Sequence, residues 1–279
     1  MTASDPRQTL ARPELADQRL EGLMRAAAFA APRAMRCRAP VAGLHAAADP
    51  GSVQEDQLLH GETFDVLETR DGWAWGQARR DGYVGFVRAE ALGPMLDAPT
   101  HRVRALRTIG LERPEVKAAA VGVLSMNALV SVGSAQKGFL DAGEAGWIFA
   151  RHMALLGDFE AEPAAVAERY LGTPYLWGGR DSLGIDCSGL VQQALYACGR
   201  ACPRDADQQM DAFPTEAPLS ALGRGDLVFW DGHVGMMLDA TRLLHANSHH
   251  MAVAVEPLAI VIERNRAAGV GDPIGARRP

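Results

Sequence analysis

The chain of 279 residues has no long apolar run and no surplus of basic residues. Its longest apolar candidate, residues 118–132, is interrupted by polar side chains and is shorter than the ~20 residues that span a membrane. The formal net charge is −6 and the arginines are scattered. This charge pattern disfavours a nucleic-acid or anionic-membrane partner. We therefore expect an ordinary globular protein with no membrane span and no nucleic-acid partner.

Cysteine is also scarce, with four residues: Cys37, Cys187, Cys198 and Cys202. In a chain of this length without an export signal, so few cysteines are expected to stay reduced. Cys198 and Cys202 have the spacing of half a zinc site, but no second cysteine pair completes it. We predict no disulfide framework, no metal and no cofactor.

The N-terminus lacks the pattern of a signal peptide. Acidic residues come early, at Asp5 and Glu14, and the apolar stretch 26–31 is short and bracketed by arginines. A cytoplasmic location is the simplest expectation.

Short β-type runs, at residues 63–67, 73–75 and 83–87, follow the N-terminal region. The pairs Asp71-Gly72 and Asp81-Gly82 separate them, and Asp-Gly between alternating runs is a strong hairpin signal. A weaker copy of the pattern follows, which predicts two tandem small barrels. The predicted segments are a helical segment at 1–32, with its helix over 11–31, a first β domain at 33–97, a second at 98–158 and a final domain at 159–279.

The final domain begins with helical patterns and ends with strand patterns. Helices are predicted over 161–171 and from Cys187 to about residue 198. Short apolar runs split by turn residues then predict an antiparallel sheet. A helix block followed by a strand block indicates an α+β domain. The predicted strands are residues 227–230, 234–238, 243–246 and 253–255.

Cys187 stands where a glycine-broken loop gives way to a helical pattern. A thiol in the first turn of a helix faces unpaired backbone N–H groups and the positive end of the helix dipole, which favour the nucleophilic thiolate. His233 and His245 follow downstream. One cysteine and two histidines in this order predict a thiol hydrolase. Taken alone, without its neighbours, such a cysteine is more often a buried helix residue.

Several motifs in chain order resemble those of the NlpC/P60 cysteine peptidases. The resemblance covers roughly residues 160–260 and implies a papain-like α+β fold that cuts bacterial cell-wall peptides. The motifs are YLGTPYLWGG at 170–179, DCSGL at 186–190, GDLVFW at 225–230, HVG at 233–235 and HA at 245–246.

The first β domain resembles bacterial SH3 (SH3b) domains through residues 57–62 and 71–86. Two SH3b units before an NlpC/P60 domain resemble the γ-D-glutamyl-L-diamino acid endopeptidases of the dipeptidyl-peptidase VI type. These release L-Ala-γ-D-Glu from murein peptides that have a free N-terminal L-Ala, before diaminopimelate or lysine. The resemblance implies a murein tripeptide or related cell-wall peptide as the partner.

Chemistry and resemblance together assign the reacting groups. Cys187 is the expected nucleophile, and His233 takes and returns the proton. His245 would hold the His233 ring, although His249 and His250 lie close by. By resemblance, Tyr175 assists the oxyanion together with the backbone N–H of Cys187. Aromatic packing against Trp177 is the alternative for Tyr175.

By the same resemblance, Asp186 and Ser188 help to hold the D-Glu moiety. Asp205 would pair with the free α-amino group of L-Ala, although Ala206 stands where related enzymes often have Ser or Thr. Asp205 and Gln208 could instead form a helix capping box.

Two residues of the first SH3b unit, Glu62 and Tyr83, match positions that reach over the cleft in related enzymes. They would bind an ammonium group and block longer peptides. The alternatives are a solvated turn residue for Glu62 and a core aromatic for Tyr83.

The resulting hypothesis is a cysteine peptidase that acts in murein-peptide recycling. Two alternatives stay open. One is a wall-lytic NlpC/P60 amidase or endopeptidase that acts on intact peptidoglycan. The other is a non-catalytic SH3b protein that binds peptides.

Overall fold

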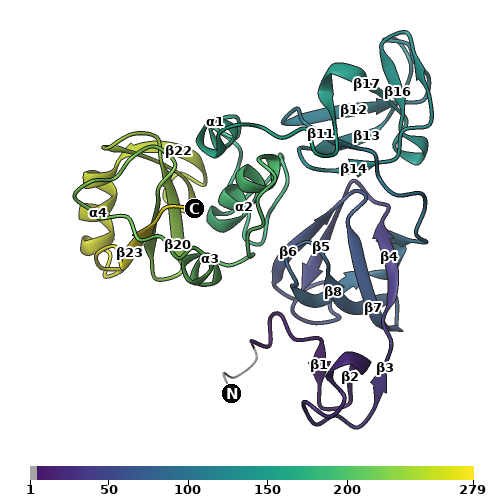
Figure 1. Cartoon of the computed structure of the whole chain (residues 1–279), viewed down its shortest axis with the longest axis horizontal. Coiled ribbons are helices and arrows are strands. Elements are labelled where there is room, and N and C mark those ends of the chain that lie inside the picture. The colour runs from purple at the N-terminus through teal and green to yellow at the C-terminus, as the bar shows by residue number, and fades with distance from the viewer. Residues whose placement is uncertain (1–4) are drawn as a thin grey trace. The chain divides into compact units, whose positions relative to one another are not determined.

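The computed structural model describes residues 5–279 and divides into two compact units, Met1–Leu156 and Gly157–Pro279 (Figure 1). The first unit is built from strands, and the second combines helices with one sheet. No helix among the described residues has the length and apolar character needed to cross a membrane. The four cysteines are free thiols.

The predicted helix over residues 11–31 is wrong, because this segment forms short strands and one 3-10 turn. Intrinsic helix preference is weak, and tertiary contacts override it here. The carbonyl of Arg7 accepts a hydrogen bond from Val84 N at 2.8 Å, and the guanidinium of Arg12 lies 4.3 Å from the centre of the Trp75 ring. The strands are β1 (Ala11–Arg12), β2 (Leu15–Asp17) and β3 (Phe29–Ala30), and the turn is Gln18–Leu20.

A seven-stranded sheet follows, in the order β10-β4-β7-β8-β9-β5-β6. Asp71 and Gly72 both have positive φ, at 50° and 79°, and join β7 to β8 as the predicted hairpin. Phe64 and Leu44 lie in the core of this sheet, fully buried. The strands are β4 (Arg33–Cys37), β5 (Val41–His45), β6 (Gln54–Leu59), β7 (Thr63–Arg70), β8 (Trp73–Ala78), β9 (Val84–Arg88) and β10 (Leu92–Gly93).

The second β region, from residue 98 to 156, forms two small sheets, ordered β14-β11-β18 and β13-β12-β17-β16-β15. The prediction of two barrels is therefore not supported, since neither sheet closes within the described residues. Many of its strands are two or three residues long, too short to pair continuously around a barrel. The strands are β11 (His101–Val103), β12 (Arg107–Leu111), β13 (Ala120–Ser125), β14 (Leu129–Val130), β15 (Ala135–Gln136), β16 (Phe139–Asp141), β17 (Trp147–Phe149) and β18 (Met153–Leu155).

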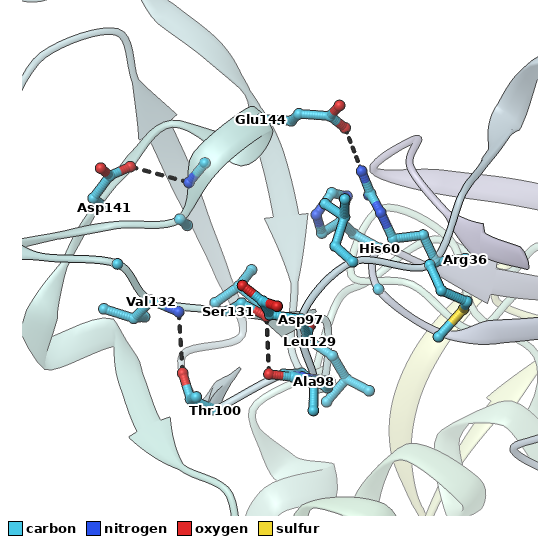
Figure 2. Close-up of a pocket in the computed structure, with 18 of the residues that line it drawn as sticks. Arg36, His60, Asp97, Ala98, Thr100, Leu129, Ser131, Val132, Asp141 and Glu144 are labelled. Atoms are coloured by element: carbon cyan, nitrogen blue, oxygen red, sulfur yellow. Dashed lines mark hydrogen bonds and ion pairs between the residues drawn. The ribbon is translucent and has the colours of Figure 1, made fainter.

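Direct contacts join the two β regions of the first unit. Leu129 N donates to His60 O at 2.8 Å, and Arg36 Nη2 lies 2.6 Å from Glu144 Oε2 (Figure 2). Gly61 is required at this junction, because its φ is +81° and a Cβ there would lie 2.1 Å from Leu129 O. A cavity of about 850 Å³ opens beside these contacts. The two β regions therefore pack against each other through backbone as well as side chains.

The second unit has the predicted α+β organisation. Helix α2 contacts β20 and β21, whereas Val261 of α4 joins a core on the sheet with Val228 and Met237. The helices α2 and α4 thus cover opposite sides of an antiparallel sheet ordered β22-β21-β20-β19-β23 (Figure 1). The elements are α1 (Pro163–Glu168), α2 (Cys187–Ala197), α3 (Ala206–Ala212), β19 (Leu227–Trp230), β20 (His233–Met237), β21 (Arg242–Asn247), β22 (Ala252–Pro257), α4 (Leu258–Ala267) and β23 (Gly275–Arg277).

Candidate active site

Cys187 is the first residue of α2, as the sequence predicts. Asp186 caps the helix, because its Oδ1 accepts a hydrogen bond from Gly189 N at 2.7 Å. Its Oδ2 accepts from Gly178 N at 2.9 Å, which ties the preceding loop to the helix. Gly189 allows the close approach of that loop, since a Cβ there would lie 2.3 Å from Gly179 O. Backbone contacts on both sides therefore hold the thiol in place.

Arg204 is a site residue to which the sequence analysis assigned no role. Its Nη2 lies 2.6 Å from Asp186 Oδ2, and its Nη1 lies 2.8 Å from Ser188 Oγ. Asp186 and Ser188 are both buried, and these contacts are to the protein itself. The structure therefore places both predicted D-Glu ligands as supports of the nucleophile helix. Their contact with substrate stays a prediction.

The two histidines lie on neighbouring strands and contact each other. His233 begins β20, His245 lies within β21, and His233 Nε2 is 2.8 Å from His245 Nδ1. His245 is almost fully buried, with 1% of its surface exposed. His250 lies in the turn after β21 and contacts Asn247 Oδ1 at 3.1 Å. Of the downstream histidines, His245 is therefore the one that contacts His233.

Glu256 extends this contact and was missed from the sequence. Its Oε2 lies 2.9 Å from His245 Nε2, on the ring edge opposite His233. Arg264 on α4 contacts both oxygens of Glu256, at 2.6 Å and 2.9 Å. The sequence feature that could have identified Glu256 is that it is the single acidic residue in the otherwise uncharged strand β22. A chain of four side chains therefore runs from His233 to Arg264.

Burial sets the protonation states of the reacting pair. It raises the pKa of the Cys187 thiol to about 12, and the carboxylate of Asp186 acts in the same direction. Burial also lowers the pKa of His233 to about 3, with His245 and Arg264 contributing. Burial therefore favours a neutral thiol at Cys187 and a neutral imidazole at His233. Desolvation therefore acts against the thiolate that the helix N-terminus favours, and the thiolate stays a prediction.

Tyr175 lies on the loop before the nucleophile, where its backbone N donates to Met251 O at 2.9 Å. Burial raises the pKa of its hydroxyl, and electrostatic interactions with Cys187 and Asp186 raise it further. The phenol is therefore held protonated and within electrostatic reach of Cys187, as a hydrogen-bond donor must be.

Asp205 is the N-cap of α3. It forms a capping box with Gln208, whose Oε1 accepts from Asp205 N at 3.3 Å. The capping box, which the sequence suggested as the alternative role of Asp205 and Gln208, is thus present. The predicted contact of Asp205 with a free α-amino group stays a prediction.

Glu62 and Tyr83 belong to the first unit, and both are buried in it, with 2% and 5% of their surfaces exposed. Glu62 Oε2 accepts from Leu59 N at 3.0 Å, so the reading of Glu62 as a solvated turn residue is wrong. Tyr83 packs in the core of the first sheet, in agreement with the alternative interpretation of this residue as a core aromatic. The predicted contacts of both residues with substrate stay predictions.

Comparison with known families gives two matches. Residues 172–267 match the NlpC/P60 family, and residues 44–92 match the bacterial dipeptidyl-peptidase Sh3 domain. One SH3 domain is therefore found where two were predicted. A crystal structure of an NlpC/P60 family protein from Bacillus cereus ATCC 10987 shares the fold, with a TM-score of 0.75 and 19% identity over 88% of this chain and 99% of that one.

Curated relatives match over part of the chain. Dipeptidyl-peptidase 6 of Lysinibacillus sphaericus is 40% identical over 90 residues, which is 32% of this chain and 33% of that protein. Gamma-D-glutamyl-L-lysine dipeptidyl-peptidase of Bacillus subtilis (strain 168) is 33% identical over 109 residues, 36% of each chain. The match thus spans about a third of each relative. The predicted family is confirmed: the chain carries an NlpC/P60 domain over residues 172–267, preceded by a bacterial SH3 domain over residues 44–92.

Proposed function

We propose that this chain is a cysteine peptidase that cleaves the bond between γ-D-Glu and a diamino acid in murein peptides with a free N-terminal L-Ala. The observation that carries the proposal is the position of Cys187 in the first turn of α2, the helix that contacts strands β20 and β21, which carry the hydrogen-bonded pair His233 and His245. The family match supports the class of enzyme, and the names of the two curated relatives support the substrate class.

The neutral resting pair defines the first step. His233 takes the thiol proton as Cys187 Sγ attacks the carbonyl carbon, which converts the carbonyl oxygen to an oxyanion. The Cys187 backbone N–H and the Tyr175 hydroxyl are the donors for this oxyanion. His233 then transfers the proton to the leaving amine of the diamino acid, and a thioester forms on Cys187. Water hydrolyses the thioester, with His233 as the base, and releases L-Ala-γ-D-Glu.

The requirement for a free amine rests on carboxylates. Asp205 caps helix α3. A carboxylate can accept several hydrogen bonds, so the same side chain can also accept one from an ammonium group. Glu62 and Tyr83 are a pair of residues that we propose to restrict the length of the peptide. This part of the proposal comes from the resemblance of these positions to those of related enzymes.

The direct test uses L-Ala-γ-D-Glu-meso-diaminopimelate, its lysine counterpart and the N-acetylated form of each. We expect mass spectrometry to detect L-Ala-γ-D-Glu from the free peptides and little product from the acetylated ones. Cys187→Ala is the control and should release no product. Equal cleavage of free and acetylated peptides would contradict the free-amine requirement, and intact Cys187 with no cleavage would contradict the function.

An incubation with intact peptidoglycan separates this proposal from its wall-lytic alternative. Release of soluble fragments from intact wall, at a rate equal to that for free tripeptide, would favour the alternative. The role in recycling and the cytoplasmic location are part of the proposal, and fractionation of cells with an antibody against the chain tests the location.

A further inference from the structure

Glu256 determines which nitrogen of His245 carries a proton. Both oxygens of Glu256 bind Arg264, at 2.6 Å and 2.9 Å, and this contact lowers the pKa of the carboxyl to about 2. An ionised carboxylate can only accept hydrogen bonds. Because Glu256 Oε2 lies 2.9 Å from His245 Nε2, that nitrogen must carry the hydrogen and donate it.

The same logic continues to His233. Burial lowers the pKa of His245, so its ring is neutral near pH 7 and its Nδ1 has no hydrogen. His233 Nε2 lies 2.8 Å from this Nδ1 and must therefore donate. The neutral ring of His233 is left with an unprotonated Nδ1. This nitrogen is the one able to accept a proton from Cys187.

We propose that Glu256, held by Arg264, is a positioning residue that fixes the tautomers of both histidines and so leaves His233 Nδ1 as the base for Cys187. The inference rests on the proposed function for the role of Cys187. In the opposite arrangement, His245 Nδ1 would donate to His233 Nε2. His233 Nδ1 would then carry the proton of the neutral ring and could not accept one from the thiol.

The fold supplies these contacts from rigid elements of the second unit. His245 pairs with Ala254 in the register of β21 with β22, which places Glu256 two residues further along the same strand. Arg264 comes from α4, the helix that follows β22 directly. His250 Nδ1 lies 3.6 Å from Glu256 Oε2 and is the further titratable group facing the carboxylate. His245 and Glu256 are 1% and 8% exposed, so water is largely excluded from their contact.

Nitrogen-15 NMR of the histidine rings tests the tautomers without any substrate. In the native protein near pH 7, we expect His245 to carry its hydrogen on Nε2 and His233 to carry its hydrogen on Nε2. In Glu256→Gln the amide can present either its oxygen or its NH₂ group to His245, so both rings should show mixed tautomers. Glu263→Gln, a substitution at an exposed position on α4, should leave the native pattern unchanged.

Kinetics test the consequence for catalysis. We expect Glu256→Gln to lower kcat for the tripeptide by roughly 10–100-fold, with KM nearly unchanged, by analogy with the loss of a carboxylate that orients a metal-binding histidine. Arg264→Met should act in the same direction, whereas Arg266→Met, at an exposed position on the same helix, should not.

The outcomes separate the two proposals. Native-like tautomers in Glu256→Gln, or a His245 ring protonated on Nδ1 in the native protein, would overturn the inference whatever the activity. A folded variant with mixed tautomers and unchanged kcat would overturn it as well. The predicted tautomers in a protein that cleaves no murein peptide would instead leave the inference on the ring protons intact and reject the proposed function.

Discussion

Arg204 binds Asp186, the residue directly before Cys187, with its Nη2 2.6 Å from Asp186 Oδ2. The pair is buried, and Asp186 at the same time caps the helix that begins with Cys187. A buried charge pair of this kind holds its elements in one arrangement, because each charge is costly to leave without the other. The position of the thiol therefore depends on a residue 17 positions further along the chain.

This relationship predicts a large loss of stability in Asp186→Ala. The guanidinium of Arg204 would stay buried without its carboxylate, which typically costs about 3–5 kcal/mol of the free energy of unfolding. Urea denaturation measures the change. Asp211→Ala, at an exposed position on α3, should change the free energy by about 0.5 kcal/mol or less. A stable Asp186→Ala protein with a raised KM would instead support the direct contact of Asp186 with D-Glu.

The protonation state of Cys187 can be measured in the free protein. Because burial raises the pKa of the thiol to about 12, the ultraviolet absorbance of a thiolate should be absent near pH 7 and should rise only in strongly alkaline solution. The difference spectrum between the native protein and Cys187→Ser removes the contribution of the other cysteines. A thiolate signal that is already complete near pH 7 would show that an ion pair with His233 is preformed.

The depressed pKa of His233 predicts a loss of stability in acid. The unfolded chain takes up a proton on this residue below pH 6.5, but the folded protein resists protonation until about pH 3. Between these values, the free energy of unfolding should fall as the pH falls, on the order of 1 kcal/mol per pH unit for this group. Above pH 6.5 its contribution is constant.

The comparison of the native protein with His233→Asn isolates this contribution, since His245 titrates in both. Urea denaturation between pH 3 and pH 7 should show a weaker loss of stability in the variant. If the free energy of unfolding falls equally with pH in the two proteins, His233 is not held in its neutral form by burial.

Tyr175→Phe tests the proposed donor to the oxyanion. Loss of one such donor typically lowers kcat by about 100-fold or more, and KM should change little because the bond strengthens in the transition state. Steady-state kinetics with the tripeptide measure both constants. Trp177→Ala is the matched variant for the packing alternative, since Trp177 lies on the same loop and is 57% exposed. An equal loss of kcat in the two variants would indicate that loop packing, not the hydroxyl, is responsible.

Local patterns were sufficient for the parts of the fold that depend on local rules. The start of α2 at Cys187 follows from a cap residue before an apolar helical pattern, and the Asp71-Gly72 hairpin follows from residues that tolerate positive φ. The family could also be predicted from the sequence, because the match depends on motifs in a given order. The conformation of the N-terminal segment could not be predicted from local patterns, because Arg7 and Arg12 contact residues more than 60 positions away.

The sequence by itself determined the family and the place of the proposed nucleophile and of the two histidines in the chain, because residue type and spacing carry that information. Tertiary structure alone decided that Arg204 holds Asp186, that Glu256 and Arg264 continue the histidine pair, and that the free site favours neutral Cys187 and His233. The physical reason is that hydrogen-bond partners and desolvation depend on which groups packing brings together and how deeply it buries them. A first-turn cysteine favours a thiolate in principle, but its burial in this fold raises the pKa of the thiol and acts in the opposite direction.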